Sequence, residues 1–208
     1  MSISERSRQR IAGTLFLCAF LAYGIGTSLV APLIDAGNAT AVLLGARGQL
    51  IVGCAMMLSN SVVVIAIGLL LRPALASANA RTANTYVTAR VFEGLALAVG
   101  AFALMSLAFP GDALSLSHVA SAKRINFIGY QSGMLALGLG SLPFCLLLFQ
   151  QRFVPRWLAL WGLLGYAIFA TGALLELFGL PYGIALSVPG GLFELVFGVW
   201  LIIRGVKL

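Results

Sequence analysis

Six apolar stretches, each about 20 residues long, constrain what this chain can fold into more than any other feature of its sequence. A stretch of this length lets an α-helix cross the hydrocarbon core of a bilayer, and in lipid a helix satisfies its own backbone hydrogen bonds. The sequence therefore predicts an all-α, polytopic transmembrane helical bundle that forms a single transmembrane domain over residues 1–208. The six predicted spans cover about residues 11–33, 49–71, 85–109, 126–149, 157–178 and 184–204.

The composition supports a membrane protein and excludes an ordinary soluble domain. Hydrophobic residues make up 61% of the chain and charged residues only 9%. The net charge of +7 does not indicate nucleic-acid binding, because the basic residues lie mainly at the ends of the spans. We therefore expect the lipid bilayer, and no nucleic acid, as a partner.

Basic residues are distributed unequally between the two ends of the predicted spans. Six spans place both termini on one side of the membrane, and that side carries most of the lysines and arginines. Because basic residues accumulate on the cytoplasmic side, we predict that both termini are cytoplasmic. The residues on the predicted inner side are Arg6, Arg8, Arg10, Arg72, Arg81, Arg152, Arg156, Arg204 and Lys207; those on the outer side are Arg47, Lys123 and Arg124.

The connections between spans differ in character. Residues 34–48 contain an apolar run too short to span, which suggests an interfacial or re-entrant piece. Residues 72–84 are typical of an ordinary cytoplasmic loop, and residues 110–125 are expected to lie along the outer surface, in part as a short helix. The last two connections are tight, so the fourth, fifth and sixth spans are predicted to be sequential antiparallel neighbours.

The third predicted span contains a cation and an anion within an otherwise apolar run. Arg90 and Glu93 are three residues apart, which places them on the same face of a helix. A charge near the bilayer interior costs at least a few kcal/mol, so it is expected to have a partner and a role.

Two further polar residues are predicted to lie near this pair. Glu93 lies about 12 Å and Glu194 about 15 Å from the cytoplasmic ends of their spans, by the rise of an α-helix. Asn60 lies near the middle of the second span. If these three spans adjoin, Asn60, Arg90, Glu93 and Glu194 form one cluster in which Arg90 neutralises one acid. The second acid would be protonated, paired with a bound cation, or solvated from a cavity.

A helix-breaking sequence precedes Glu194 in the last span. Pro189 removes a backbone donor, and the following Gly190 and Gly191 loosen the helix, so we predict a kink or break just outside Glu194. Many transporters build substrate or ion sites from broken helices at this depth. The alternative is a structural kink beside a buried Arg–Glu clamp.

Small residues in the fourth span indicate close helix packing. Gly129 and Gly133 form a G-x-x-x-G pair, which lets two helix backbones approach closely in lipid. Packing within one chain is the favoured interpretation, and a homo-oligomer contact is the alternative.

The sequence lacks the residues that intramembrane enzymes require at depth. Its single histidine, His118, lies outside the predicted spans, and so do both lysines and both aspartates. A zinc site, a Ser–His dyad, an aspartyl dyad and a Schiff-base lysine therefore all lack their residues. We predict no enzymatic activity, no catalytic residue, no metal and no cofactor.

Three short motifs carry a resemblance to a known family. They are Arg10-Ile11-Ala12-Gly13, Arg90 with Glu93, and Pro189-Gly190-Gly191-Leu192-Phe193-Glu194 ending in Trp200-Leu201-Ile202-Ile203-Arg204-Gly205. With these motifs the chain resembles, over nearly its whole length, a family of small bacterial six-span integral membrane proteins catalogued only as a domain of unknown function. The resemblance implies a multi-pass protein of the bacterial cytoplasmic (inner) membrane, and it implies that Arg90, Glu93 and Glu194 are shared positions.

Two classes of function fit these features. The leading hypothesis is a small transporter, channel or ligand-binding membrane protein whose cavity is lined by the Arg/Glu cluster and takes a small ligand or ion. The alternative is an accessory or structural subunit of a larger membrane protein complex, in which the cluster only locks the bundle. A water-accessible Glu194 would favour the first hypothesis, and a dry cluster with a copurifying membrane-protein partner would favour the second.

Overall fold

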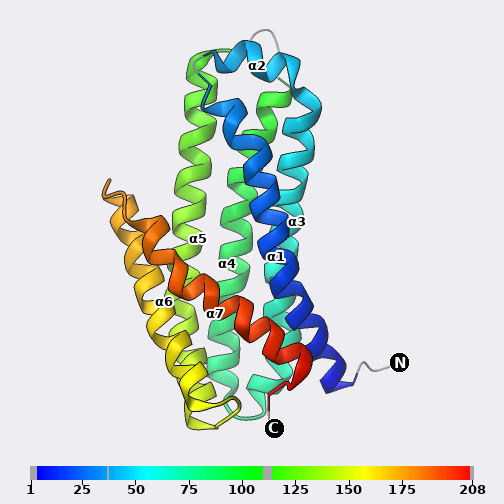
Figure 1. Cartoon of the computed structure of the whole chain (residues 1–208), viewed down its shortest axis with the longest axis vertical. Coiled ribbons are helices and arrows are strands. Elements are labelled where there is room, and N and C mark those ends of the chain that lie inside the picture. Colours follow the sequence, from blue (N-terminus) through cyan, green and yellow to red (C-terminus); the bar gives the residue numbers. More distant parts are fainter. Residues whose placement is uncertain (1–3, 37, 110–113, 207–208) are drawn as a thin grey trace.

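A computed structural model describes residues 4–36, 38–109 and 114–206, and these residues form a bundle of long helices (Figure 1). Six of the helices are long and apolar enough to cross a membrane, which confirms the predicted all-α fold with six spans. The elements are α1 (Glu5–Ile34), α2 (Ala39–Gly45), α3 (Arg47–Ala76), α4 (Ala80–Met105), the 3-10 turn η1 (Ser106–Ala108), α5 (Leu116–Gln150), α6 (Arg156–Leu177) and α7 (Gly183–Ile203).

The six long helices form a ring in chain order. Each of α1, α3, α4, α5 and α6 packs along the next long helix in the sequence, and α7 returns to pack along α1. The last three spans are therefore sequential neighbours, as their tight connections predict. Because α7 closes the ring against α1, the described part of the bundle has an inner face and an outer face.

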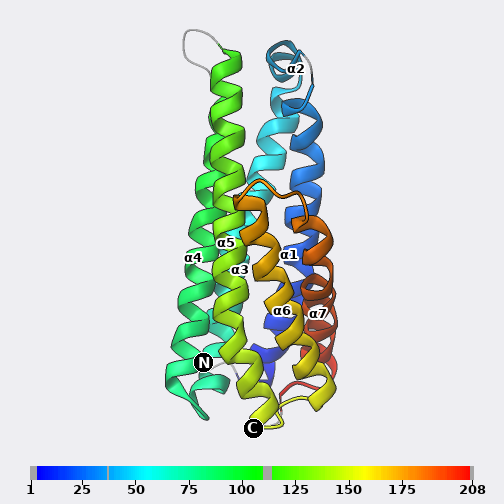
Figure 2. The same cartoon turned by 90° about the vertical axis from the view of Figure 1, so that its left-hand side faces the viewer.

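The ring is not equally complete along its height. At the rise of an α-helix, α5 is about 52 Å long and α7 about 32 Å long. Figures 1 and 2 show that α6 and α7 accompany the other spans over only the lower part of the bundle. Contacts also link α5 to α1 and to Asp35, the residue that follows α1. The rings of Tyr23 and Tyr130 stack with their centroids 5.4 Å apart, and Lys123 Nζ lies 2.5 Å from Asp35 Oδ1.

Glycines allow the close approach of neighbouring helices around the ring. A Cβ atom added to Gly13 of α1 would lie 2.5 Å from the carbonyl oxygen of Gly198 in α7. Gly129 and Gly133 face the backbone of α4, at Ala96 and Glu93. The G-x-x-x-G pair therefore packs within the chain, as favoured from the sequence.

Two of the predicted connections, residues 72–84 and 110–125, are partly helical, because the neighbouring helices are longer than the predicted spans. Only residues 77–79 separate α3 from α4, so most of the predicted 72–84 loop is helical. Residues 116–125 form the first turns of α5 and not a separate surface helix. N-capping side chains explain both corrections. Asn79 accepts a hydrogen bond from the Thr82 N–H at 3.0 Å, and Ser115 accepts one from the His118 N–H at 3.2 Å.

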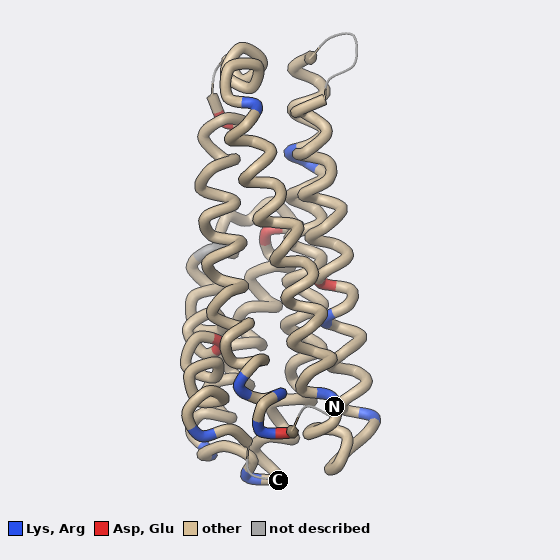
Figure 3. Tube along the Cα trace, turned by 90° about the vertical axis from the view of Figure 1, so that its right-hand side faces the viewer, with Lys and Arg blue, Asp and Glu red and all other residues tan. Residues whose placement is uncertain are grey.

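The two ends of the bundle differ in structure and in charge. The short helix α2 lies across one end (Figure 1), where Ala39 and Leu43 are buried, and it corresponds to the interfacial piece predicted within residues 34–48. Figure 3 shows several basic residues at the opposite end, where α1 begins and α7 ends. Lys207 and residues 110–113 lie outside the described part of the chain. Which side of the membrane each end faces stays a prediction.

Arg6 of α1 caps the C-terminal end of α7. Its guanidinium donates hydrogen bonds to the carbonyl oxygens of Leu201, Ile202 and Ile203 at 3.2, 3.2 and 2.7 Å. The last carbonyl groups of a helix have no partner within the helix, and a cation there also interacts favourably with the helix dipole. This contact therefore holds the ring closed at one end.

We expect the substitution Arg6→Ala to lower the free energy of unfolding by about 1–2 kcal/mol, because it removes charged hydrogen bonds from a partly buried helix end. Thermal unfolding in detergent measures the loss. Arg10→Ala is the matched control, since Arg10 is exposed on the same helix and should change stability little. Equal effects of the two substitutions would show that the cap contributes nothing.

Candidate functional site: a charged cavity inside the helix ring

Arg90 is the centre of an ion cluster between α4 and α7. Arg90 and Glu93 are 1% and 3% exposed. Arg90 Nη1 donates a hydrogen bond to Glu93 Oε2 at 3.0 Å, and Arg90 Nη2 donates one to Glu194 Oε1 at 2.6 Å. The structure thus brings together the three charged residues singled out in the sequence. One guanidinium pairs with both carboxylates, not with one of them.

Two tyrosines complete the hydrogen bonding of the cluster. Arg90 Nε donates to the Tyr86 hydroxyl oxygen at 3.0 Å, and the Tyr166 hydroxyl donates to Glu194 Oε1 at 2.8 Å. Sequence reasoning missed both. Tyr86 lies four residues before Arg90 on the same helix face, and this spacing could have identified it. Tyr166 lies on a different helix from Glu194, so no local spacing points to it.

Aromatic side chains pack against the cluster. The Arg90 guanidinium carbon lies 5.1 Å from the ring centroid of Phe16 and 5.4 Å from that of Tyr86. Phe144 stacks on Tyr86 with centroids 4.4 Å apart, and Phe197 contacts Phe144 edge to face at 5.6 Å. These rings exclude water from one side of the ion pairs, which strengthens them.

A cavity of about 220 Å³ lies inside the ring, with the ion cluster in its wall. All six long helices contribute to its lining. Glu194 keeps 14% of its side chain exposed, whereas Glu93 keeps 4%. The lining residues are Phe16, Ala19, Phe20, Tyr23, Gly24, Asn60, Val64, Ile67, Arg90, Glu93, Leu97, Tyr130, Met134, Leu137, Phe169, Ser187, Gly191 and Glu194.

Asn60 joins the charged residues in this wall, as the sequence suggests. It is 4% exposed, and no described residue donates a hydrogen bond to its side-chain oxygen, Oδ1. A buried acceptor without a donor costs about 1–3 kcal/mol. Because Asn60 lines the cavity, a molecule bound there could supply the donor.

Of the kink or break predicted at Pro189, the break is wrong, and the kink stays a prediction. Helix α7 is continuous from Gly183 to Ile203, through Pro189, Gly190 and Gly191. Contacts with α6 override the local tendency to break. The Trp161 indole N–H donates to the Pro189 carbonyl oxygen at 3.1 Å, and a Cβ added to Gly165 would lie 3.2 Å from the Gly190 Cα. Gly165 and Gly190 therefore allow close packing of α6 and α7. Gly191 instead faces Phe20 of α1 and lines the cavity.

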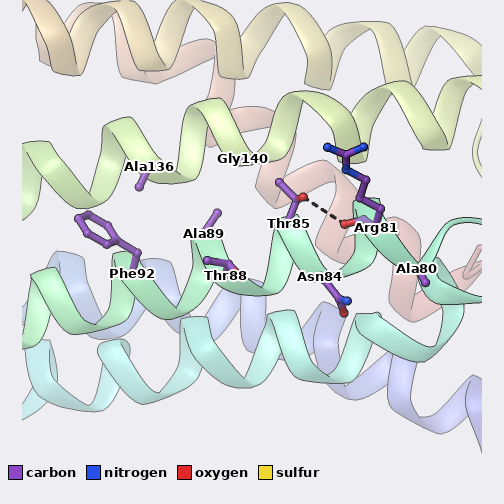
Figure 4. Close-up of a pocket in the computed structure, with 9 residues that line it drawn as sticks. All are labelled: Ala80, Arg81, Asn84, Thr85, Thr88, Ala89, Phe92, Ala136 and Gly140. Atoms are coloured by element: carbon purple, nitrogen blue, oxygen red, sulfur yellow. Dashed lines mark hydrogen bonds between the residues drawn. The ribbon is translucent and has the colours of Figure 1, made fainter.

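A second, larger hollow lies between α4 and α5 on the outer face of the ring (Figure 4). It is an open groove of about 780 Å³, floored by small residues such as Ala89 and Gly140. Of the described residues that line it, Arg81 is the one with a charged side chain. The Thr85 hydroxyl donates to the Arg81 carbonyl oxygen at 3.1 Å. The groove contains none of the ion cluster, so the smaller inner cavity is the better candidate for a functional site.

Nearly the whole chain matches a protein family. No curated protein and no solved structure matches it. The family model of DUF4386, described as a domain of unknown function, matches residues 11–205, a range that includes the ion cluster and the cavity. The match confirms the resemblance seen in the sequence. With six helices long and apolar enough to cross a membrane, the chain therefore belongs to the DUF4386 family, which is described as a domain of unknown function.

Proposed function

We propose that this protein is a small ligand-binding membrane protein of transporter or channel type, whose inner cavity receives a small ligand or ion. The observation that carries the proposal is that Asn60 Oδ1 accepts no hydrogen bond from any described residue, although it is buried in a cavity wall beside three charged side chains. A pocket with a few convergent polar groups and apolar walls is the usual form of a ligand site. In this proposal the chain has no catalytic role.

The alternative, an accessory subunit held together by an Arg–Glu clamp, accounts for fewer of these features. The pairs that Arg90 makes with Glu93 and Glu194 fit a clamp as well as a binding site. A clamp, however, requires neither a hollow beside the charges nor an unpaired buried acceptor. Those two features favour ligand binding.

We also propose that the protein lies in the bacterial cytoplasmic membrane with both termini in the cytoplasm. The unequal distribution of lysine and arginine supports this orientation, since basic residues accumulate on the cytoplasmic side. Its direct partner in that setting is the lipid bilayer.

Chemical labelling of Asn60→Cys tests whether small molecules reach the cavity. The purified protein is treated with methyl methanethiosulfonate in nanodiscs, and peptide mass spectrometry follows each cysteine separately. We expect the new cysteine to react at least tenfold faster than Cys145, because the cavity admits small solutes. Cys145 is fully buried and does not line the cavity, so it is an internal control. Equal, slow rates at both positions would mean a closed, dry cluster and would favour the structural clamp.

A further inference from the structure

The charges in the cavity wall are unbalanced. Among the described residues of the lining, Arg90 is the one basic residue, and it pairs with two acids, Glu93 and Glu194. With both acids ionised, the cluster has one negative charge in excess. A buried charge that lacks a partner is costly, so a cation in the cavity would be strongly favoured.

The hydrogen-bonding groups of the cavity wall include acceptors that a bound donor would satisfy. Asn60 Oδ1 is an acceptor that no described residue satisfies, and it is 96% buried, given its 4% exposure. Glu194 lines the same cavity with part of its side chain exposed. An ammonium group carries only donors and a positive charge, so it complements a carboxylate and an amide oxygen together.

The remaining walls favour an organic cation over a metal ion. Phe16, Phe20, Tyr23, Tyr130 and Phe169 line the cavity, and aromatic faces attract organic cations. Among the described residues, no group of three His, Cys, Asp or Glu side chains could hold a metal ion. The volume of about 220 Å³ is below the range for drug-sized ligands, so the ligand is smaller than those.

We propose that the cavity binds a small organic amine in its cationic form, with the ammonium group between Glu194 and Asn60 and the apolar body against the aromatic wall. This inference rests on the proposed function and assigns it a ligand class. The amine adds the positive charge that Arg90 alone does not supply, and it donates a hydrogen bond to Asn60 Oδ1.

Three probes of similar shape and different charge test the ligand class. Benzylamine, benzyl alcohol and benzoate are titrated against the purified full-length protein in nanodiscs, with thermal unfolding and calorimetric binding as measurements. We expect benzylamine to raise the unfolding temperature in a saturable way, and the alcohol and the benzoate to bind at least tenfold more weakly. Glu194→Gln and Asn60→Leu should each weaken benzylamine binding by at least tenfold.

A matched control separates site binding from a general charge effect. Asp35→Asn removes an acid that pairs with Lys123 at the end of the bundle, outside the cavity lining, and it should leave benzylamine binding unchanged. Circular dichroism and unfolding without ligand report whether each variant folds. If Glu194→Gln does not fold, Asn60→Leu provides the test, because it keeps every ion pair.

The possible failures are distinguishable. Equal binding of benzyl alcohol or benzoate, or undiminished benzylamine binding in Asn60→Leu, would overturn the amine assignment. If Asn60→Cys still reacts rapidly in that case, the proposed ligand-binding function stands with another ligand class. If none of the probes binds and Asn60→Cys does not react, both proposals fail.

Discussion

Replacing Arg90 with methionine is expected to lower the free energy of unfolding by about 3–5 kcal/mol, the largest effect of any single substitution considered for this chain. Arg90 is 1% exposed and pairs with Glu93 and Glu194. The substitution leaves both carboxylates without the cation they share, and it removes the donor to Tyr86. Denaturation in mixed detergent micelles, followed by circular dichroism, measures the loss.

A triple variant provides the control for this substitution. Arg90→Met combined with Glu93→Gln and Glu194→Gln removes the cation and both carboxylates, so no buried charge is left without a partner. We expect it to recover most of the lost stability, because replacing a whole buried ion cluster is often nearly neutral. A single Arg90→Met variant as stable as the wild type would show that the carboxylates need no cation in the folded protein.

The second large effect is expected from one added methyl group at the contact between α1 and α7. A Cβ at Gly13 would lie 2.5 Å from the Gly198 carbonyl oxygen and 2.9 Å from the Ile202 side chain. Because the nearest obstacle is backbone, Gly13→Ala must push the two helices apart, and we expect a loss of about 1–3 kcal/mol. Thermal unfolding in detergent measures it.

Gly24→Ala is the matched control on the same helix. An added Cβ at Gly24 meets nothing within 4 Å. Since alanine favours a helix over glycine by roughly 1 kcal/mol, this variant should be unchanged or slightly more stable. Opposite signs for Gly13→Ala and Gly24→Ala would identify helix contact as the cause. A gain in stability for both variants would mean that helix propensity, and not helix contact, determines the effect.

The spans could be predicted from the sequence because a bilayer imposes a length and a polarity on every helix that crosses it. The helix ends could not be predicted from hydropathy, since α4 and α5 begin at the polar caps Asn79 and Ser115, several residues before the apolar runs. The closure of the ring by α7 against α1 could not be predicted from the sequence either. It depends on the fit of Gly13 against Gly198, which only the folded arrangement shows.

The ion cluster was predictable for a different reason. Arg90 and Glu194 stand out because a charge in an apolar span needs a partner at its own depth. Tyr166 was missed because a tyrosine in a span has many ordinary roles, and nothing in the sequence marks its bond to Glu194. The break expected at Pro189 does not occur. That expectation rested on the helix-breaking tendency of Pro189 and the two glycines alone, and it did not include the neighbouring helix α6, whose Trp161 donates a hydrogen bond to the Pro189 carbonyl oxygen.

The separation of Arg90 from Glu194 along the chain has a consequence for biogenesis. The two residues are 104 positions apart, and ribosomes add about 5–20 residues per second, so Arg90 is made roughly 5–20 s before Glu194. During that interval its neighbour Glu93 already forms part of the same helix and gives the nascent span a local counter-charge. A translocon therefore meets Arg90 and Glu93 as a balanced pair. Glu194 arrives later with α7, and the docking of α7 completes the cavity wall.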